Sequence, residues 1–232
     1  KIIIIDNSNL SYSGDDISGT IVRGTESSLI LLAEQFVRMG IEVDYCNSID
    51  DMKKVKGVNY FNKKHINKNS IYNLAIAISD ANEFYRVSSI KKAVFSNSNQ
   101  PIEKFIRKKQ LLPFLKFKPT LITLCDYQLK KRSFFTSFYG KRTIPITVDP
   151  KFLDIIIDKN HLPEKKVVYN IRSNRNLDKL IKIWCEKIFP INNEFKLYIT
   201  PNLIEYTNYH TVHNIFLRTI GTREEMIDEL KD

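Results

Sequence analysis

Short apolar runs alternate with segments of helical periodicity from the first residue onward. Residues 1–6 form a continuous aliphatic run closed by polar residues, the pattern of a parallel strand buried on both faces. Residues 26–39 place apolar side chains at helical spacing, and Gly40 follows as a stop signal. Residues 41–46 predict a second strand. The start of the chain therefore predicts a strand, a helix and a strand joined as a parallel crossover.

The same alternation continues along the chain in two series. The first series predicts further strands at residues 74–78, 93–95, 121–125 and 144–148. The second predicts a strand at 166–169, a helix at 177–189 and strands at 195–199 and 214–220. Strands that alternate with helical segments predict an α/β fold with doubly wound parallel sheets.

A domain boundary is predicted where the first series ends, at a hinge of Val148, Asp149 and Pro150. We predict an N-terminal domain at 1–147 and a second domain at 148–232. The helix of the second domain is expected to bury one apolar face that contains Leu177, Leu180, Ile181, Trp184 and Ile188. Thr222 and Glu225 have the spacing of a capping box that opens a last helix. Three strands and two helices are few for a nucleotide-binding domain, so we expect the second domain to be incomplete.

The positive charge lies in the first domain. The net charge is +10, and residues 1–147 carry 23 basic and 13 acidic residues, whereas 148–232 carry 13 of each. Residues 51–147 alone carry 20 basic and 5 acidic residues, a net charge of +15. This asymmetry indicates an anionic partner on that side: nucleic acid, membrane lipid or an acidic saccharide. The basic runs at 107–117 and 130–139 are interleaved with aromatic residues, and this pattern also suits a peripheral membrane surface.

Cysteine and histidine usage predicts no disulfide framework and no metal centre. The three cysteines, Cys46, Cys125 and Cys185, are odd in number and lie in apolar segments, so we expect buried thiols and a cytoplasmic location. The basic segment described above adds the expectation of peripheral contact at the inner face of the membrane. The four histidines have no cysteine or carboxylate partners at ligand spacing. No apolar run approaches the roughly 18–20 residues of a membrane-spanning helix.

Two strand-to-helix loops are candidate anion sites, because helix N-termini present free backbone N–H groups. The first is at Gly24 and Thr25, where the long helix begins. The second runs from Tyr169 to Asp178 and contains Arg172 and Arg175, whose guanidinium groups are suited to bind a diphosphate through paired hydrogen bonds.

These residues resemble the signatures of family 4 glycosyltransferases. In that family Gly-Gly-Thr-Glu precedes an apolar helix and Gly-His-Glu-Val follows it; here the matching residues are Arg23 to Glu26 and Gly40 to Val43. The family's donor loop, often Tyr-x-Ser-Arg-Pro-x-Arg-Gly-Leu-Asp, is similar to Tyr169 to Asp178, with both arginines at its basic positions. The hinge at 148–150 and the turn at Gly221 and Thr222 are also similar, whereas residues 50–140 match only loosely.

The resemblance implies a GT-B fold of two Rossmann-like domains and transfer of a sugar from a nucleoside-diphosphate sugar, in polysaccharide biosynthesis. Arg172 and Arg175 would stabilise the departing diphosphate, and the backbone at Gly24 and Thr25 would face the leaving group or the acceptor. The resemblance places four further residues on nucleotide-side loops: Asn170, Thr200, Gly221 and Thr222. It implies no cofactor and no metal, and an anionic or lipid-linked saccharide as acceptor.

The sequence also departs from the family pattern. Asn176 replaces a usual glycine before the donor-domain helix, and Asn97 corresponds to a histidine of relatives. The family's paired glutamates belong to a segment beyond residue 232, so no catalytic residue is assigned and the donor domain is expected to be truncated.

Three other functions compete with this interpretation. A metal-dependent GT-A enzyme requires an Asp-x-Asp motif, which the sequence lacks. A nucleic-acid-binding protein fits the basic segment, but no helix-turn-helix, zinc-finger or RNP-like motif accompanies it, so nucleic acid is not the expected partner. A non-catalytic module that binds a sugar nucleotide or an anionic saccharide keeps the arginines without the chemistry, and it is the main alternative.

Overall fold

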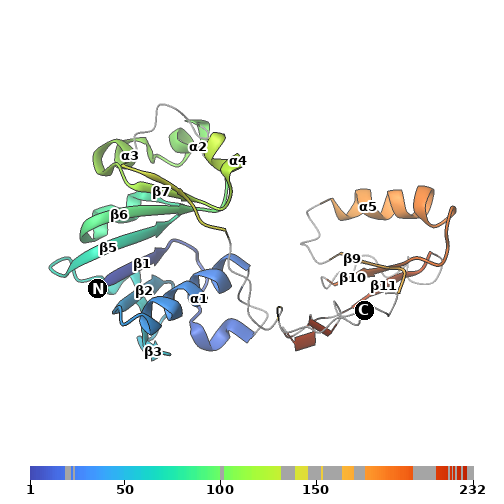
Figure 1. The fold of residues 1–232 in the computed structure, drawn as a ribbon, viewed down its shortest axis with the longest axis horizontal. Helices are drawn as coiled ribbons and strands as arrows, with labels where there is room; N and C mark the ends of the chain where they lie inside the picture. Colours follow the sequence, from blue (N-terminus) through green and yellow to red (C-terminus); the bar gives the residue numbers. More distant parts are fainter. Residues whose placement is uncertain are drawn as a thin grey trace. The chain divides into compact units, whose positions relative to one another are not determined.

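The chain divides into two compact units. The computed structural model describes residues 1–18, 22, 24–99, 102–131, 139–145, 153, 164–169, 176–200, 213–218, 220, 222, 224–225 and 227–228. Unit 1 consists of Lys1–Ile17 and Ile21–Asp149, and unit 2 consists mainly of Pro150–Asp232 (Figure 1). The predicted hinge at 148–150 lies outside the described residues.

The described part of unit 1 contains eight strands. They are β1 (Ile2–Asp6), β2 (Val43–Asn47), β3 (Lys53–Val55), β4 (Val58–Asn62), β5 (Ile71–Ile78), β6 (Ser88–Ser96), β7 (Thr120–Thr123) and β8 (Lys141–Thr143). Its α-helices are α1 (Gly24–Arg38), α2 (Ile102–Arg107), α3 (Leu111–Phe117) and α4 (Asp126–Lys130), and 3₁₀ turns cover Gly14–Ser18, Lys63–His65 and Ala81–Arg86.

The sheet of unit 1 is parallel except at one edge. Its strand order is β3-β4-β2-β1-β5-β6-β7-β8, and only the β3–β4 pair is antiparallel. If the six strands from β4 to β7 are numbered in chain order, the sheet reads 3-2-1-4-5-6, an order shared by Rossmann-like doubly wound sheets. The chain leaves β1 toward β2 on one side and leaves β5 toward β6 on the other. The topological switch point therefore lies between β1 and β5.

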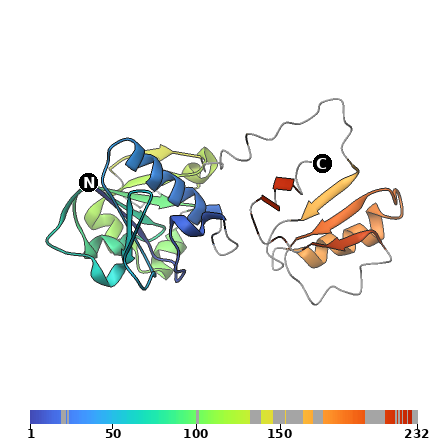
Figure 2. The ribbon, with the colours of Figure 1, turned by 90° about the horizontal axis from the view of Figure 1, so that it is seen from below.

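Alternate residues of β1 face two different cores, which explains its uninterrupted apolar sequence. Ile2 and Ile4 belong to the core that contains Leu29 and Ile30 of α1. Ile3 and Ile5 belong to the opposite core, which contains Phe84 of the 3₁₀ turn and Phe114 of α3. All five residues of β1 are buried, so the predicted doubly covered parallel strand is confirmed. Figures 1 and 2 show α1 and α3 on opposite sides of the sheet.

The predicted first crossover is confirmed, whereas Ile144 and Pro145, the two described residues of the strand predicted at 144–148, do not belong to a strand. The long helix spans Gly24–Arg38, and Gly40 follows with φ +77°. Among the described residues of unit 1, the last strand is Lys141–Thr143, which lies beside β7. Ile144 still donates its N–H to the Thr123 carbonyl at 2.8 Å, but Pro145 has no N–H with which to continue the ladder. Residues 146–148 lie outside the described part of the chain.

The β3–β4 hairpin has no counterpart in the sequence-based prediction. Its two-residue turn, Lys56 and Gly57, has φ +46° and +86°, the left-handed pair that favours glycine in tight hairpins. β3 carries two lysines and one buried valine, so it shows no apolar periodicity. It is an edge strand, where lysine opposes pairing with other chains.

Unit 2 has a three-stranded parallel sheet with the order β11-β10-β9. Its elements are β9 (Lys166–Tyr169), α5 (Leu177–Ile183), a π-helical turn (Trp184–Ile188), β10 (Lys196–Ile199) and β11 (Ile215–Leu217). Leu177, Ile181 and Trp184 are buried against the sheet, and the two other predicted apolar residues, Leu180 and Ile188, pack beside them. The Trp184 indole N–H donates to the His213 carbonyl at 2.7 Å. Figures 1 and 2 show α5 along one face of this sheet.

Two smaller predictions about unit 2 have different outcomes. The capping box is confirmed, because Glu225 N–H donates to Thr222 Oγ1 and Thr222 N–H donates to Glu225 Oε2, each at 3.2 Å. The strand predicted at 214–220 is too long, since β11 ends at Leu217.

The prediction of three buried thiols holds for one cysteine. Cys46 on β2 is buried, Cys185 is half-buried and Cys125 is exposed. Cys125 immediately precedes α4, after β7 has ended, so the apolar run 121–125 continues past the buried strand into a loop. Whether a thiol is buried therefore depends on where the strand ends and not on where the apolar run ends.

Candidate ligand site at the carboxyl edge of the large sheet

Polar residues gather where the parallel strands of unit 1 end, beside the switch point between β1 and β5. In doubly wound sheets, ligands bind at this edge because the loops diverge there. Six residues form what we call the switch-point edge: Asn7, Thr25, Lys63, Ser79, Asp80 and Asn97. They follow β1, β4, β5 and β6 or begin α1, so four separate crossovers contribute to one edge.

The loop after β1 is shaped by the buried carboxylate of Asp6. Its Oδ1 accepts the Ser8 N–H at 3.0 Å, and its Oδ2 accepts the Ser8 hydroxyl at 2.7 Å and the Tyr12 hydroxyl at 2.5 Å. The hydroxyls of Tyr12 and Tyr45 are 2.7 Å apart, and since Tyr12 donates to Asp6, Tyr45 donates to Tyr12. Burial raises the pKa of both phenols. They therefore act as neutral supports that position Asn7 at the edge.

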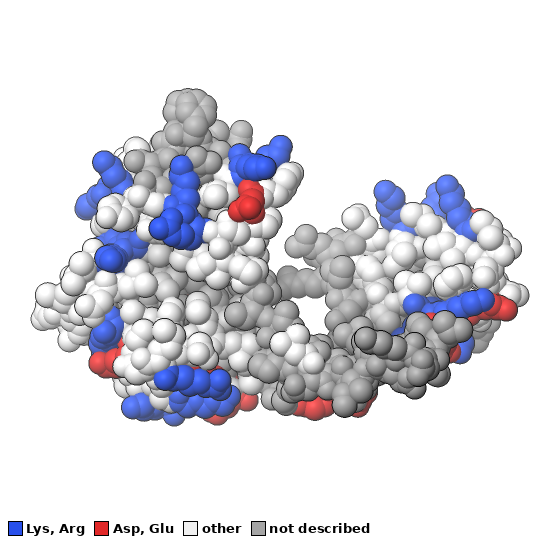
Figure 3. All heavy atoms as spheres, in the orientation of Figure 1, with Lys and Arg blue, Asp and Glu red and all other residues white. Residues whose placement is uncertain are grey.

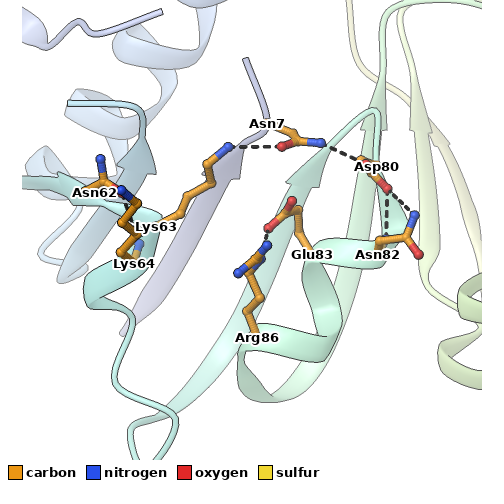
Figure 4. Close-up of polar contacts among 8 residues, drawn as sticks. All are labelled: Asn7, Asn62, Lys63, Lys64, Asp80, Asn82, Glu83 and Arg86. Atoms are coloured by element: carbon orange, nitrogen blue, oxygen red, sulfur yellow. Dashed lines mark hydrogen bonds and ion pairs between the residues drawn. The ribbon is translucent and has the colours of Figure 1, made fainter. Parts of the chain in front are cut away.

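Asn7 joins the ends of three strands, as Figure 4 shows. Its Oδ1 accepts from Lys63 Nζ at 3.0 Å, and its Nδ2 donates to Asp80 Oδ2 at 2.8 Å. The other oxygen of Asp80 accepts both the backbone N–H and the side-chain amide of Asn82 at 2.9 Å, which caps the 3₁₀ turn. This line of a cation, an amide and a carboxylate presents donors and acceptors of the kinds that bind hydroxyl groups.

A second line of hydrogen bonds connects β5 and β6 with the start of α1. The Ser79 hydroxyl donates to Asn97 Oδ1 at 3.2 Å, and Asn97 Nδ2 donates to Thr25 Oγ1 at 3.3 Å. Ser79 holds a left-handed backbone conformation, with φ +57°. An amide offers two donors and two lone pairs, and Asn97 uses one of each with the described residues, which leaves one N–H and one lone pair for a ligand.

The structure places the predicted anion loop, Gly24 and Thr25, in the first turn of α1 at this edge. The first N–H groups of a helix have no intrahelical acceptor, and the helix dipole is positive there. Glu26 lies in the same turn and is buried, and its Oε2 has no hydrogen-bond donor among the described residues. A carboxylate in the first turn opposes a second anion, so the edge suits the neutral hydroxyls of a ligand better than a phosphate.

Lys104 is a half-buried cation that contacts the loop after β6. Its Nζ donates to Ser98 Oγ at 2.6 Å and to the Asn99 carbonyl at 3.4 Å. Burial, with added repulsion from Lys108 and Arg107, lowers the pKa of Lys104 to about 8. Both of its hydrogen-bond acceptors are neutral, so this ammonium is charged but not paired with a carboxylate in the described structure.

The described residues near the edge supply binding chemistry and no activated nucleophile. Burial, together with the charges of Asp44 and Glu83, raises the pKa of the Cys46 thiol, so Cys46 stays protonated. Glu83 is buried and forms an ion pair with Arg86, with 2.8 Å between Oε2 and Nε (Figure 4). Among the residues that the structure describes, no three His, Cys, Asp or Glu side chains are grouped so that they could hold a metal ion.

Most of the predicted donor-side residues are not described. Arg172, Arg175, Asn170 and Gly221 lie outside the described residues. Thr200 directly follows β10, and its hydroxyl donates to the Tyr169 carbonyl at 3.2 Å, at the carboxyl edge of the small sheet. Thr222 caps the short helical segment that contains Glu224 and Glu225.

The asparagine that departs from the donor-loop pattern has the backbone of a glycine. Asn176 immediately precedes α5 with φ 64° and ψ 30°, in the left-handed region. Asparagine visits this region more readily than most residues with a side chain. The replacement of the usual glycine by Asn176 therefore keeps a left-handed entry into the helix.

Sequence reasoning missed four members of the switch-point edge: Asn7, Lys63, Ser79 and Asp80. Each lies one or two residues after the end of a strand, and this position was the only available signal.

Comparison of the chain with protein-family models and with curated protein sequences found no match. Within the described residues, none of the helices combines the length and apolarity needed to cross a membrane.

Proposed function

We propose that the chain is a GT-B-type glycosyltransferase that moves a sugar from a nucleoside-diphosphate sugar to a saccharide or lipid-linked acceptor. One observation carries the proposal. Gly24 and Thr25, in the motif that resembles family 4 glycosyltransferases, begin α1 at the switch point, where Asn97 connects Thr25 to the end of β5. The best-matching motif therefore lies where a doubly wound sheet binds ligands.

The chemistry of the edge supports an acceptor role for unit 1. Sugar hydroxyls donate and accept hydrogen bonds, and amides and carboxylates match both functions. Asn7, Asp80 and Asn97 present these groups on one edge. Glu26 in the first turn of α1 disfavours a diphosphate there, so in this proposal the nucleotide belongs to unit 2.

The donor role of unit 2 rests on the sequence between β9 and α5. Both arginines of the resembling loop, Arg172 and Arg175, fall in a strand-to-helix connection of a parallel sheet. Paired guanidinium groups stabilise the negative charge that grows on a departing diphosphate.

The test measures binding of nucleoside diphosphates to the full chain by calorimetry. We expect one diphosphate to bind, and the double variant Arg172→Ala, Arg175→Ala to weaken binding at least tenfold, since a charged hydrogen bond contributes about 1.5–3 kcal/mol. The matched control is Lys182→Ala, Lys187→Ala, which removes the same charge from exposed positions on the helical segment of unit 2. Binding unchanged in the arginine variant, or equally weakened in the control, would refute the donor site.

A second measurement separates the acceptor edge from the donor site. Asp80→Asn and Asn97→Ala are expected to lower sugar transfer and leave diphosphate binding unchanged, because both residues belong to unit 1. A chain that binds the diphosphate but transfers no sugar to any saccharide acceptor would be a sugar-nucleotide-binding module.

A further inference from the structure

The surface of α2 and α3 combines exposed aliphatic side chains with an excess of positive charge. Residues 102–118, which span α2 and α3, contain six basic residues and one acidic residue, Glu103. Ile106, Leu112 and Leu115 are 62%, 73% and 42% exposed. With the exposed Lys108, Lys109 and Lys116, they form what we call the α2–α3 surface. Figure 3 shows Lys and Arg side chains gathered over α2, α3 and α4, with few acidic atoms among them.

The exposed aliphatic residues of α3 lie on the side of the helix that faces away from the core. In α3, Phe114 is fully buried in the core, so the opposite side of the helix faces outward. Leu112, Leu115 and Lys116 have spacings of three and four residues and share that outward side. The helix therefore has two apolar sides, and among the described residues only the side of Phe114 packs into the core of unit 1.

We propose that the α2–α3 surface docks unit 1 onto an anionic membrane surface. Segments that lie in the membrane interface bury leucine and isoleucine among the lipid chains, while lysine and arginine contact anionic headgroups. Charge complementarity favours this occupant, because an apolar protein partner would not require the excess of cations that α2 and α3 carry. The proposal is independent of the proposed sugar transfer, since none of these residues belongs to the switch-point edge.

The aromatic residues nearby argue against single-stranded nucleic acid as the occupant. Nucleic-acid-binding surfaces offer aromatic faces on which bases stack. Here Lys116 Nζ lies 4.8 Å from the Tyr85 ring centroid and 5.4 Å from that of Phe117. The two rings also pack edge to face, 4.9 Å apart. Tyr85 is 50% exposed, but Lys116 and Phe117 already contact its ring. The other exposed apolar side chains of the α2–α3 surface, Ile106, Leu112 and Leu115, are aliphatic and offer no stacking face.

This surface is fixed to the switch-point edge by hydrogen bonds. Gln110, directly before α3, is buried; its Nε2 donates to the Ser79 carbonyl at 3.1 Å, and its Oε1 accepts the Ala81 N–H at 3.3 Å. Ser79 and Asp80 thus lie on the segment to which α3 is anchored. A membrane-bound unit 1 would therefore hold this edge at a fixed position relative to the lipid.

The test is sedimentation of the full chain with phosphatidylcholine vesicles that either contain or lack phosphatidylglycerol, without any sugar nucleotide. We expect binding that needs phosphatidylglycerol and weakens as salt is raised. Lys108→Ala, Lys109→Ala should weaken binding about 25-fold, because each cation near an anionic surface contributes about fivefold. The charge-matched control is Lys53→Ala, Lys54→Ala on β3, which should change binding less than twofold.

A second pair of variants tests insertion. Leu112→Ser, Leu115→Ser should weaken vesicle binding at least tenfold, whereas Met52→Ser, Ile71→Ser, at sites 69% and 72% exposed, should not. Absence of binding to phosphatidylglycerol vesicles at low salt would overturn the proposal. So would binding that survives both α2–α3 variants, or lysine-dependent binding to a single-stranded polynucleotide that excludes vesicles. Because no nucleotide is present, the result is independent of whether the donor site works.

Discussion

Replacing Gly57 by alanine is expected to destabilise unit 1 by about 3 kcal/mol, through backbone strain and through a clash. Gly57 has φ +86°, and a Cβ there would lie 2.5 Å from Val37 Cγ1 on α1. A left-handed conformation costs a residue with a Cβ roughly 1–2 kcal/mol, and about 0.4–1 kcal/mol is recovered because the unfolded chain loses entropy. Displacing a packed side chain adds about 1–3 kcal/mol.

Gly40 provides a matched control for this prediction. It has φ +77°, but a Cβ there would meet no atom within 4 Å. Gly40→Ala should therefore carry only the backbone cost, about 1 kcal/mol after the entropy gain. The difference of about 2 kcal/mol between the two variants measures the contact with Val37.

The assay is urea unfolding of the full chain followed by two probes. Circular dichroism reports both units, whereas the single tryptophan, Trp184, lies in unit 2 and reports that unit by fluorescence. We expect Gly57→Ala to lower the circular-dichroism midpoint well below that of Gly40→Ala. The same midpoint for the two variants would refute the assignment of the extra cost to Val37. Recovery of part of the loss in Gly57→Ala, Val37→Ala would support it, because shortening Val37 removes the clash.

Two further predictions concern a backbone conformation and a titration. Asn176→Gly should change the free energy of unfolding of unit 2 by less than about 0.5 kcal/mol, whereas Asn176→Val should lower it by about 1–2 kcal/mol. Trp184 fluorescence measures both effects, and equal effects would refute the role of the left-handed backbone. Because the folded pKa of Lys104, about 8, lies below its ordinary value of 10.5, the unfolded chain binds more protons between these pH values. Stability, measured as the melting temperature, should therefore rise with pH from about 8 to about 10. Lys104→Met should flatten this rise, whereas the exposed control Lys64→Met should not. An unchanged slope in Lys104→Met would contradict the lowered pKa of Lys104.

Elements with strong apolar patterns could be predicted from the sequence. Residues 1–6 and 26–39 gave the first strand and helix because both elements bury apolar faces, and 166–169 matched β9 residue by residue. The β3–β4 hairpin could not be predicted this way, because its stability comes from a left-handed turn and from pairing with a neighbouring strand. β8 is similar: its three residues are exposed and polar, and only pairing with β7 makes them a strand.

The switch-point edge could be predicted only in part, for a topological reason. Gly24 and Thr25 precede a recognisable helix, and this local signal is enough to identify a helix N-terminus. Asn7, Lys63, Asp80 and their partners follow different strands, and each alone resembles an ordinary turn residue. They meet because the strand order places β4, β2, β1 and β5 side by side, and no local pattern encodes that order.

Two asparagines stand where the resembling family has other residues, and the structure gives them different consequences. Asn176 keeps the left-handed backbone that glycine would supply, so that departure conserves geometry. Asn97 lies between Ser79 and Thr25 and forms hydrogen bonds with both, at a position compared above with a histidine of family 4 glycosyltransferases. An amide does not titrate as an imidazole does near neutral pH. Asn97 is therefore suited to orient a ligand hydroxyl and not to remove its proton. In the proposed transfer, the proton of the acceptor must go to another group, such as a carboxylate or the departing diphosphate.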